Sequence, residues 1–198
     1  MAKEQAAAVS AEDIVAQVDT GGRNPVGWQK TLFLWIAFLW AVVQLYIASN
    51  VPFYLTDLTG LDVILTSSES RRVHLAFAIF LAAMAFPLFK NSPKDYIPWY
   101  DWLLAGLGIV VCLYAIVFND AISVRAGLPI PADLVISGVG LVVLGISVYR
   151  ALGLPLAIIS TIFICYVFFG HAESLPDVVR WKGASFGKAT WHYWMQDE

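Results

Sequence analysis

The chain has 198 residues, of which 59% are apolar and only 14% are charged, and its formal net charge is −3 at pH 7. A soluble domain of this size needs more charge on its surface, so the composition argues against one. The acidic balance also argues against the basic surface that nucleic-acid binding requires. We therefore expect a membrane domain and no sizeable soluble domain.

Residues 1–27 are polar, and we expect them to form a tail without a cleavable signal peptide. Ser10 and Asp13 have the spacing of a capping box, which predicts a short amphipathic helix that ends at Gly21-Gly22. The helix is either solvated or lies on a membrane or partner surface.

Five runs without Asp, Glu, Lys or Arg follow this tail, and their length and apolarity are typical of membrane spans. We predict an all-α fold: a polytopic helical bundle of about five transmembrane helices with interfacial helices. The membrane domain covers residues 28–170, with spans at about 28–49, 72–90, 102–118, 134–149 and 154–170. A membrane interior without ionisable groups lacks the ion and proton sites that active transport uses, which favours a scaffold role.

The region 134–170 requires a choice between one helix and two. As a single straight helix, its 37 residues would be about 55 Å long, which is far more than a bilayer core needs. Arg150, Gly153 and Pro155 interrupt the run near its middle. We therefore expect two spans joined by a turn that places Arg150 at the surface; the alternative is one strongly kinked helix.

Two segments are expected to lie at the membrane surface. Segment 50–70 is too polar to cross, and Tyr54, Leu58, Leu61 and Leu65 form one helical stripe, which predicts an interfacial helix that Gly60 weakens. Residues 171–198 are polar but rich in aromatic side chains, which predicts an interfacial tail leading to a junction with a further domain.

Few residues are candidates for a functional site. Gln44 is a strongly polar side chain inside a span, where an interhelical hydrogen bond worth about 1 kcal/mol or substrate binding would use it. Trp28 and Trp35 lie one heptad apart and could contact a partner helix. The aromatic and arginine residues at span boundaries are predicted interface anchors: Trp99, Tyr100, Trp102, Arg71, Arg72 and Arg150.

The histidines and cysteines, which could in principle bind metal or carry out chemistry, are expected to have structural roles. His74 and His171 lie at span ends and His192 in the tail, where interfacial hydrogen bonding is expected rather than haem ligation. Cys112 and Cys165 lie in apolar runs and are expected to pack as small hydrophobes. No catalytic, cofactor-binding or metal-ligating motif is recognisable, so we expect no enzymatic activity.

Taken together, an ordered set of segments resembles a known family over residues 28–198. The segments are Gln44-Leu45-Tyr46, Arg71–Ala78, Pro98–Leu104, Asp133-Leu134, and Arg150 with Gly153-Leu154-Pro155-Leu156. Their order and spacing resemble the small membrane (Q-type) portion of a TRAP transporter permease of the TAXI type.

The resemblance implies a role in ion-coupled secondary transport, a symport that imports organic anions across the bacterial inner membrane. The partners it implies are a large elevator-type membrane subunit and a periplasmic TAXI-type substrate-binding protein. The coupling ion, Na⁺ or H⁺, would bind the large subunit, and no cofactor is expected in this chain. The small portion would brace the large one, either as a separate chain or as part of a fused permease divided near Glu198.

The resemblance also supplies an orientation. Lys and Arg residues near the span ends number five on each side, so charge alone does not decide it. The family implies a cytoplasmic N-terminus and a periplasmic C-terminal tail, with the loops 50–70 and 119–133 in the periplasm. We expect Asp57, Asp62 and Arg125 in these loops to face the binding protein. The rival functions are an anchor or assembly subunit of another membrane complex and a small self-sufficient transporter.

Overall fold

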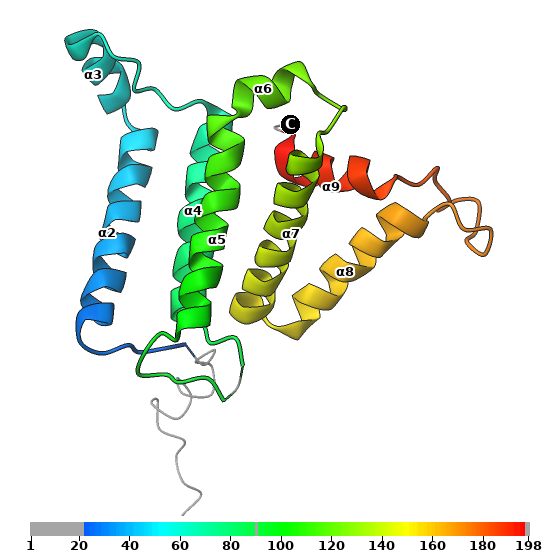
Figure 1. The fold of residues 1–198 in the computed structure, drawn as a ribbon, viewed down its shortest axis with the longest axis horizontal. Coiled ribbons are helices and arrows are strands. Elements are labelled where there is room, and N and C mark those ends of the chain that lie inside the picture. The colour runs from blue at the N-terminus through cyan, green and yellow to red at the C-terminus, as the bar shows by residue number, and fades with distance from the viewer. Residues whose placement is uncertain (1–21, 90, 197–198) are drawn as a thin grey trace, which may run out of the picture.

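The computed structural model describes residues 22–89 and 91–196, and every regular element in them is a helix (Figure 1). The all-α prediction is therefore confirmed, whereas the helix predicted from Ser10 lies outside the described residues. The elements are α2 (Trp28–Ala48), α3 (Val51–Thr59), α4 (Ser67–Ala85), α5 (Trp99–Val117), α6 (Asn119–Val124), α7 (Pro131–Leu152), α8 (Leu154–Phe169) and α9 (Phe186–Met195).

Three of these helices, α2, α5 and α7, are long and apolar enough to cross a membrane. Helix α8 is apolar but shorter, at 16 residues or about 24 Å. Helix α4 has 19 residues, but its first turns carry the charged residues Glu69, Arg71 and Arg72. The chain therefore has the architecture of a helical membrane protein with three candidate spans and a shorter apolar helix.

Helix α4 begins earlier than the charge-free run predicted. Thr66 and Glu69 form a capping box: the Thr66 hydroxyl accepts a hydrogen bond from the Glu69 N–H at 3.2 Å, and the Glu69 carboxylate accepts one from the Thr66 N–H at 2.8 Å. This cap satisfies backbone donors that the first turn leaves unpaired. Residues expected to precede the span at residue 72 are therefore already helical.

The predicted stripe over segment 50–70 is only partly helical. Helix α3 ends at Thr59 because Gly60 adopts a left-handed conformation with a φ of 70°, which glycine tolerates without strain. Leu61 and Leu65 follow this break and do not belong to the helix, so the prediction of one continuous interfacial stripe is wrong.

The region 134–170 consists of two helices. Helix α7 ends at Leu152, and α8 begins two residues later at Leu154. Gly153 between them has a φ of 81°, a conformation that residues with a Cβ rarely adopt. Figure 1 shows that α8 leaves α7 at an angle, with the two helices diverging from this turn.

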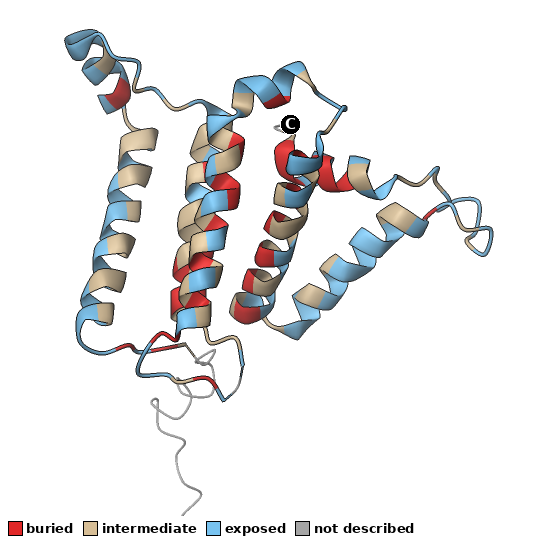
Figure 2. Cartoon of the chain, in the orientation of Figure 1, coloured by how far each residue is buried: buried red, intermediate tan, exposed pale blue. Residues whose placement is uncertain are grey.

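The hydrophobic core lies between α4, α5, α7 and α9. Ile79, Val111, Val143 and Trp194 are each less than 7% exposed and belong to one cluster. Figure 2 shows buried positions along all four helices, whereas no residue of α2 or α8 is buried.

Part of the C-terminal segment belongs to this core, contrary to the expectation of an interfacial tail. Helix α9 crosses α7 and buries Trp191 and Trp194 (Figure 1). The Trp194 indole N–H donates to the carbonyl oxygen of Val111 at 3.2 Å. Gly140 of α7 lies so close to this indole that a Cβ at residue 140 would overlap it. An aromatic-rich helix is therefore docked onto a glycine-bearing one.

Candidate functional site

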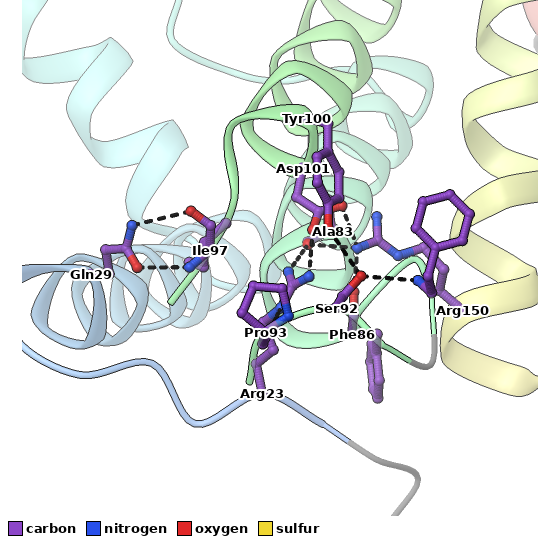
Figure 3. Close-up of polar contacts among 11 residues, drawn as sticks. Arg23, Gln29, Ala83, Phe86, Ser92, Pro93, Ile97, Tyr100, Asp101 and Arg150 are labelled. Atoms are coloured by element: carbon purple, nitrogen blue, oxygen red, sulfur yellow. Dashed lines mark hydrogen bonds and ion pairs between the residues drawn. The ribbon is translucent and has the colours of Figure 1, made fainter. Parts of the chain in front are cut away.

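The end of the bundle where α5 begins and α7 ends holds a buried cluster of three charged side chains (Figure 3). Asp101, in the first turn of α5, is fully buried. Its carboxylate accepts from Arg23 Nη2 at 2.5 Å and from Arg150 Nη2 at 2.7 Å. We call Arg23, Asp101 and Arg150 the basal cluster.

The basal cluster also binds the C-terminal end of α4. Arg150 donates to the carbonyl oxygens of Ala83, at 3.1 Å, and of Phe86, while Arg23 Nη1 donates to Ala83 at 3.4 Å. Carbonyls at a helix C-terminus carry partial negative charge, and a carboxylate is favourable near a helix N-terminus. The two guanidinium groups thus face one full and several partial negative charges, which ties the ends of α4, α5 and α7 together.

We expected Arg150 at the surface of a turn, but the structure buries it. Its side chain is inaccessible because Asp101 and the α4 carbonyls surround part of the guanidinium. Sequence reasoning assigned no site role to Arg23 or Asp101. The available signal was topological: the start of the third predicted span and the end of the fourth lie on the same side of a bundle, so Asp101 and Arg150 could meet there.

The segment before α2 is tethered to the loop between α4 and α5. Asn24 N–H donates to the Lys94 carbonyl and Val26 N–H to the Asp95 carbonyl, each at 3.0 Å. Gln29 then pairs with the backbone of Ile97: its Nε2 donates at 3.3 Å and its Oε1 accepts at 2.8 Å. These contacts fix the start of α2 beside the start of α5.

A second ion pair lies at the opposite end of the bundle. Arg125 donates from Nε and Nη2 to the two carboxylate oxygens of Asp133, both at 2.8 Å. The buried carboxylate also accepts from the Tyr114 hydroxyl at 2.9 Å and from the Ile130 N–H at 3.2 Å. The hydrogen bond from Arg125 to Asp133 raises the pKa of Arg125 above its already high usual value. Arg125, which we expected to face a docking partner, is therefore held in an intramolecular bidentate pair.

The two arginines that precede the second apolar run behave differently. Arg71 is exposed and donates to the Ser67 carbonyl within its own helix. Arg72 is buried and donates to the carbonyl oxygens of Trp194, at 3.1 Å, and Met195, at 2.9 Å. Positive charge at the last turn of α9 is stabilised by the helix dipole. Arg72, predicted as an interface anchor, thus fixes α9 to the bundle.

The predicted aromatic anchors also divide into packed and exposed side chains. Trp28 stacks on Trp102 with ring centroids 5.9 Å apart, which joins α2 to α5. The Tyr100 hydroxyl lies 3.0 Å from Ser92 Oγ in the loop between α4 and α5. Trp35 and Trp99 are 64% and 76% exposed, respectively.

The other predicted residues are not brought together. Gln44 Nε2 is buried and has no hydrogen-bond partner among the described residues, so the expected interhelical bond from this amide is not formed within this part of the chain. Asp57 lies exposed on α3 and Asp62 follows in the next loop, whereas Arg125 lies beyond α6. Among the residues described, no group of three or more His, Cys, Asp or Glu side chains could hold a metal ion.

Helices α2 and α8 both expose many large apolar side chains. On α2, Trp35 and Phe38 stack edge to face and project from the chain, and both are at least 60% exposed. On α8, Ile162 and Phe163 are exposed to a similar degree. We call these the α2 face and the α8 face; they require a cover of lipid or protein. No family model, curated protein or solved structure matches this chain.

Proposed function

We propose that this chain is a non-catalytic scaffold, namely the small membrane portion of a TRAP-type transporter that braces a large elevator-type subunit. The observation that carries the proposal is that α2 and α8, which flank a packed bundle, are apolar and have no buried residue. The resemblance of residues 28–198 to the Q-type portion of TAXI permeases supplies the partner.

The mechanism of such a scaffold is static. The basal cluster joins the segment before α2 to three helices of the bundle, and the Arg125–Asp133 pair closes the opposite end. A bundle tied at both ends holds α2 and α8 at fixed positions in the membrane. The fixed part of the large subunit would pack on these helices by van der Waals contact, while its moving part carries the substrate and the coupling ion.

The proposal includes an orientation and a transient partner. The basal cluster would face the cytoplasm, and α3 and α6 would face the periplasm of a bacterial inner membrane. There, the exposed carboxylates of Asp57 and Asp62 are available to a TAXI-type binding protein. Arg125 is a weaker candidate because Asp133 already neutralises it.

A co-expression experiment tests the scaffold role. The chain is produced alone and together with the product of the neighbouring gene, and each preparation is reconstituted into proteoliposomes with the binding protein. We expect a stable complex with a large permease and organic-anion uptake only when both membrane components are present. Uptake by this chain alone would show a self-sufficient transporter, and co-purification with an unrelated enzyme would show a membrane anchor.

A further inference from the structure

A pocket of about 530 Å³ lies between α9, the end of α8 and the loop that joins α6 to α7. Its walls include Gly127 of that loop, Val167 of α8 and one side of α9. Figure 1 shows α9 running between the ends of α7 and α8 that lie away from their common turn at Gly153. Small-molecule sites usually have volumes of about 300–1,000 Å³, so this pocket can hold a ligand larger than a single side chain.

One side of α9 brings basic side chains to this pocket. Lys188 and His192 are four residues apart, so they lie in one row along the helix, and both are exposed and line the pocket. No ion pair joins Lys188 to another described residue. No Asp or Glu is among the residues that line the pocket. The pocket therefore presents an accessible positive charge that lacks a carboxylate counter-charge among the described residues.

A hydrogen bond orients the polar groups beside Lys188. Gln196 follows His192 by four residues and also lines the pocket. The amide oxygen Oε1 of Gln196 accepts a hydrogen bond from His192 Nδ1. Gln196 Nε2 is left as a hydrogen-bond donor without an acceptor among the described residues. The row thus offers an ammonium group and an amide donor to an anion.

The pocket lies at the level of the membrane surface. Gly187, at the start of α9, is close to Leu134 in the first turn of α7, because a Cβ at residue 187 would be 3.5 Å from the leucine side chain. Val167 is two residues from the end of α8. Since α7 is a candidate span and α8 a shorter apolar helix, these ends mark the border of the hydrocarbon core. Trp181 and Tyr193, of the aromatic types that gather at this border, also line the pocket.

We propose that this pocket binds the headgroup of an anionic phospholipid, with Lys188 as the counter-charge of the phosphate and Gln196 Nε2 as a hydrogen-bond donor. The rings of Trp181 and Tyr193 and the side chain of Val167 would cover the glycerol and the first methylene groups. Basic pockets between membrane helices bind anionic headgroups in this way.

Charge, depth and lining together favour a lipid over other anions. A phospholipid combines a phosphate with an apolar body and is present at this depth of the membrane. A free phosphate has no apolar part to place against the aromatic walls. An acidic side chain of a protein partner would pair with Lys188 but would leave most of the pocket unfilled. The bound lipid would join α9 to α8, a helix without any buried residue.

Native mass spectrometry of the full chain tests the lipid. The purified chain is incubated in detergent with equal amounts of phosphatidylglycerol and phosphatidylcholine that carry the same acyl chains, so that only the headgroups differ. We expect phosphatidylglycerol to be retained about fivefold more, the effect of one favourable lysine contact with an anionic lipid. Equal retention of the two lipids, or displacement of phosphatidylglycerol by excess inorganic phosphate, would overturn the proposal.

Three variants locate the lipid in the pocket. Lys188→Gln should reduce the retention of phosphatidylglycerol to that of phosphatidylcholine. Lys182→Gln removes an exposed lysine outside the pocket and, as the matched control, should keep the wild-type preference. Ala126→Trp places a bulky ring at an exposed position of the pocket wall without changing the charge, and it should also abolish the preference. A preference that survives in Lys188→Gln or in Ala126→Trp would contradict a lipid in this pocket.

A photoreactive residue distinguishes a lipid from a protein partner. Benzoylphenylalanine replaces Tyr193, an exposed residue of the pocket wall, in intact membranes. We expect a phospholipid adduct at this position. An adduct with another protein would show that the pocket is a protein interface and would overturn the proposal. Either result is independent of the scaffold role, which depends on the α2 face and the α8 face.

Discussion

The central bundle and the flanking helices have similar composition but opposite environments. Helix α2 is as apolar as α5 and α7, yet none of its candidate span is buried, against 33% of the span of α5 and 28% of that of α7. Helix α8, also strongly apolar, has no buried residue either. Apolarity therefore predicts that a helix lies in the membrane, but not which neighbour covers it.

Two glycines mark close helix contacts within the bundle. Helix α5 contains Gly108, against which Ile79 packs, and α7 contains Gly140, against which Trp194 packs. Neither α2 nor α8 contains a glycine. In a lipid environment, helices associate where small residues let them approach closely, which accounts for the tight packing of α4 on α5 at Gly108 and of α9 on α7 at Gly140. The bulky α2 and α8 faces are left for other molecules.

The largest effect is expected from the basal cluster. Asp101→Asn removes the only full negative charge that contacts Arg23 and Arg150 among the described residues. Unpairing buried charges typically costs about 3–5 kcal/mol, so we expect a strongly lowered midpoint of thermal unfolding in detergent. Asp57→Asn, at an exposed position, is the matched control and should unfold as the wild type does. Equal midpoints for both variants would refute a basal cluster that supports the bundle.

Two glycine variants of α7 compare a position that packs against α9 with a position that contacts nothing. Gly140→Ala forces a Cβ into the Trp194 indole and should destabilise the chain by about 1–3 kcal/mol. Gly138→Ala meets no atom within 4 Å and should be neutral or stabilising by up to about 1 kcal/mol. Thermal unfolding of the two purified variants, side by side, measures the difference. The docking of α9 on α7 would be wrong if both behaved alike.

The Arg125–Asp133 pair should have a smaller effect because the arginine is partly exposed. Arg125→Gln leaves the buried Asp133 carboxylate with only the Tyr114 hydroxyl and the Ile130 N–H as donors among the described residues, so we expect a small, measurable loss of stability. Arg71→Gln removes an exposed arginine of α4 and should change stability by less than about 0.5 kcal/mol. Chemical denaturation in mixed micelles measures the free energy of unfolding of both variants. An equal loss of stability in the two would mean that the ion pair of Arg125 with Asp133 does not stabilise the chain.

The smallest effect on stability is expected on the α2 face. The double variant Trp35→Ala and Phe38→Ala should unfold within about 0.5 kcal/mol of the wild type, because both side chains project from the chain. If the proposed scaffold role holds, the same variant should lose most of its co-purification with a large membrane subunit. Retained co-purification, or a large loss of the chain's own stability, would place these side chains in a different role.

Sequence reasoning located most helices but missed their packing. Charge-free runs and the breakers Gly153 and Pro155 indicate where apolar helices lie, because these signals are local. The early start of α4 was also visible locally, in the capping box of Thr66 and Glu69, but the charged residues beside it outweighed that signal.

The burial of Arg150, Arg72 and α9 depends on contacts between residues far apart in the chain. Arg150 pairs with a carboxylate 49 residues away, and Arg72 with carbonyls more than 120 residues away. Aromatic density in the C-terminal segment is equally typical of a headgroup belt and of a docked helix. Only the complementary gap at Gly140 distinguishes them, and a gap of this kind is a property of the assembled bundle.

Cross-linking in intact membranes tests most directly whether the flanking helices bind a protein. Benzoylphenylalanine is placed at Trp35 and Phe38 on the α2 face, at Ile162 and Phe163 on the α8 face, and at the buried control position Val143. In cells that also contain the neighbouring gene product, we predict adducts with one large membrane protein from the two faces and none from Val143. Adducts with lipid alone at every exposed position would contradict the scaffold role.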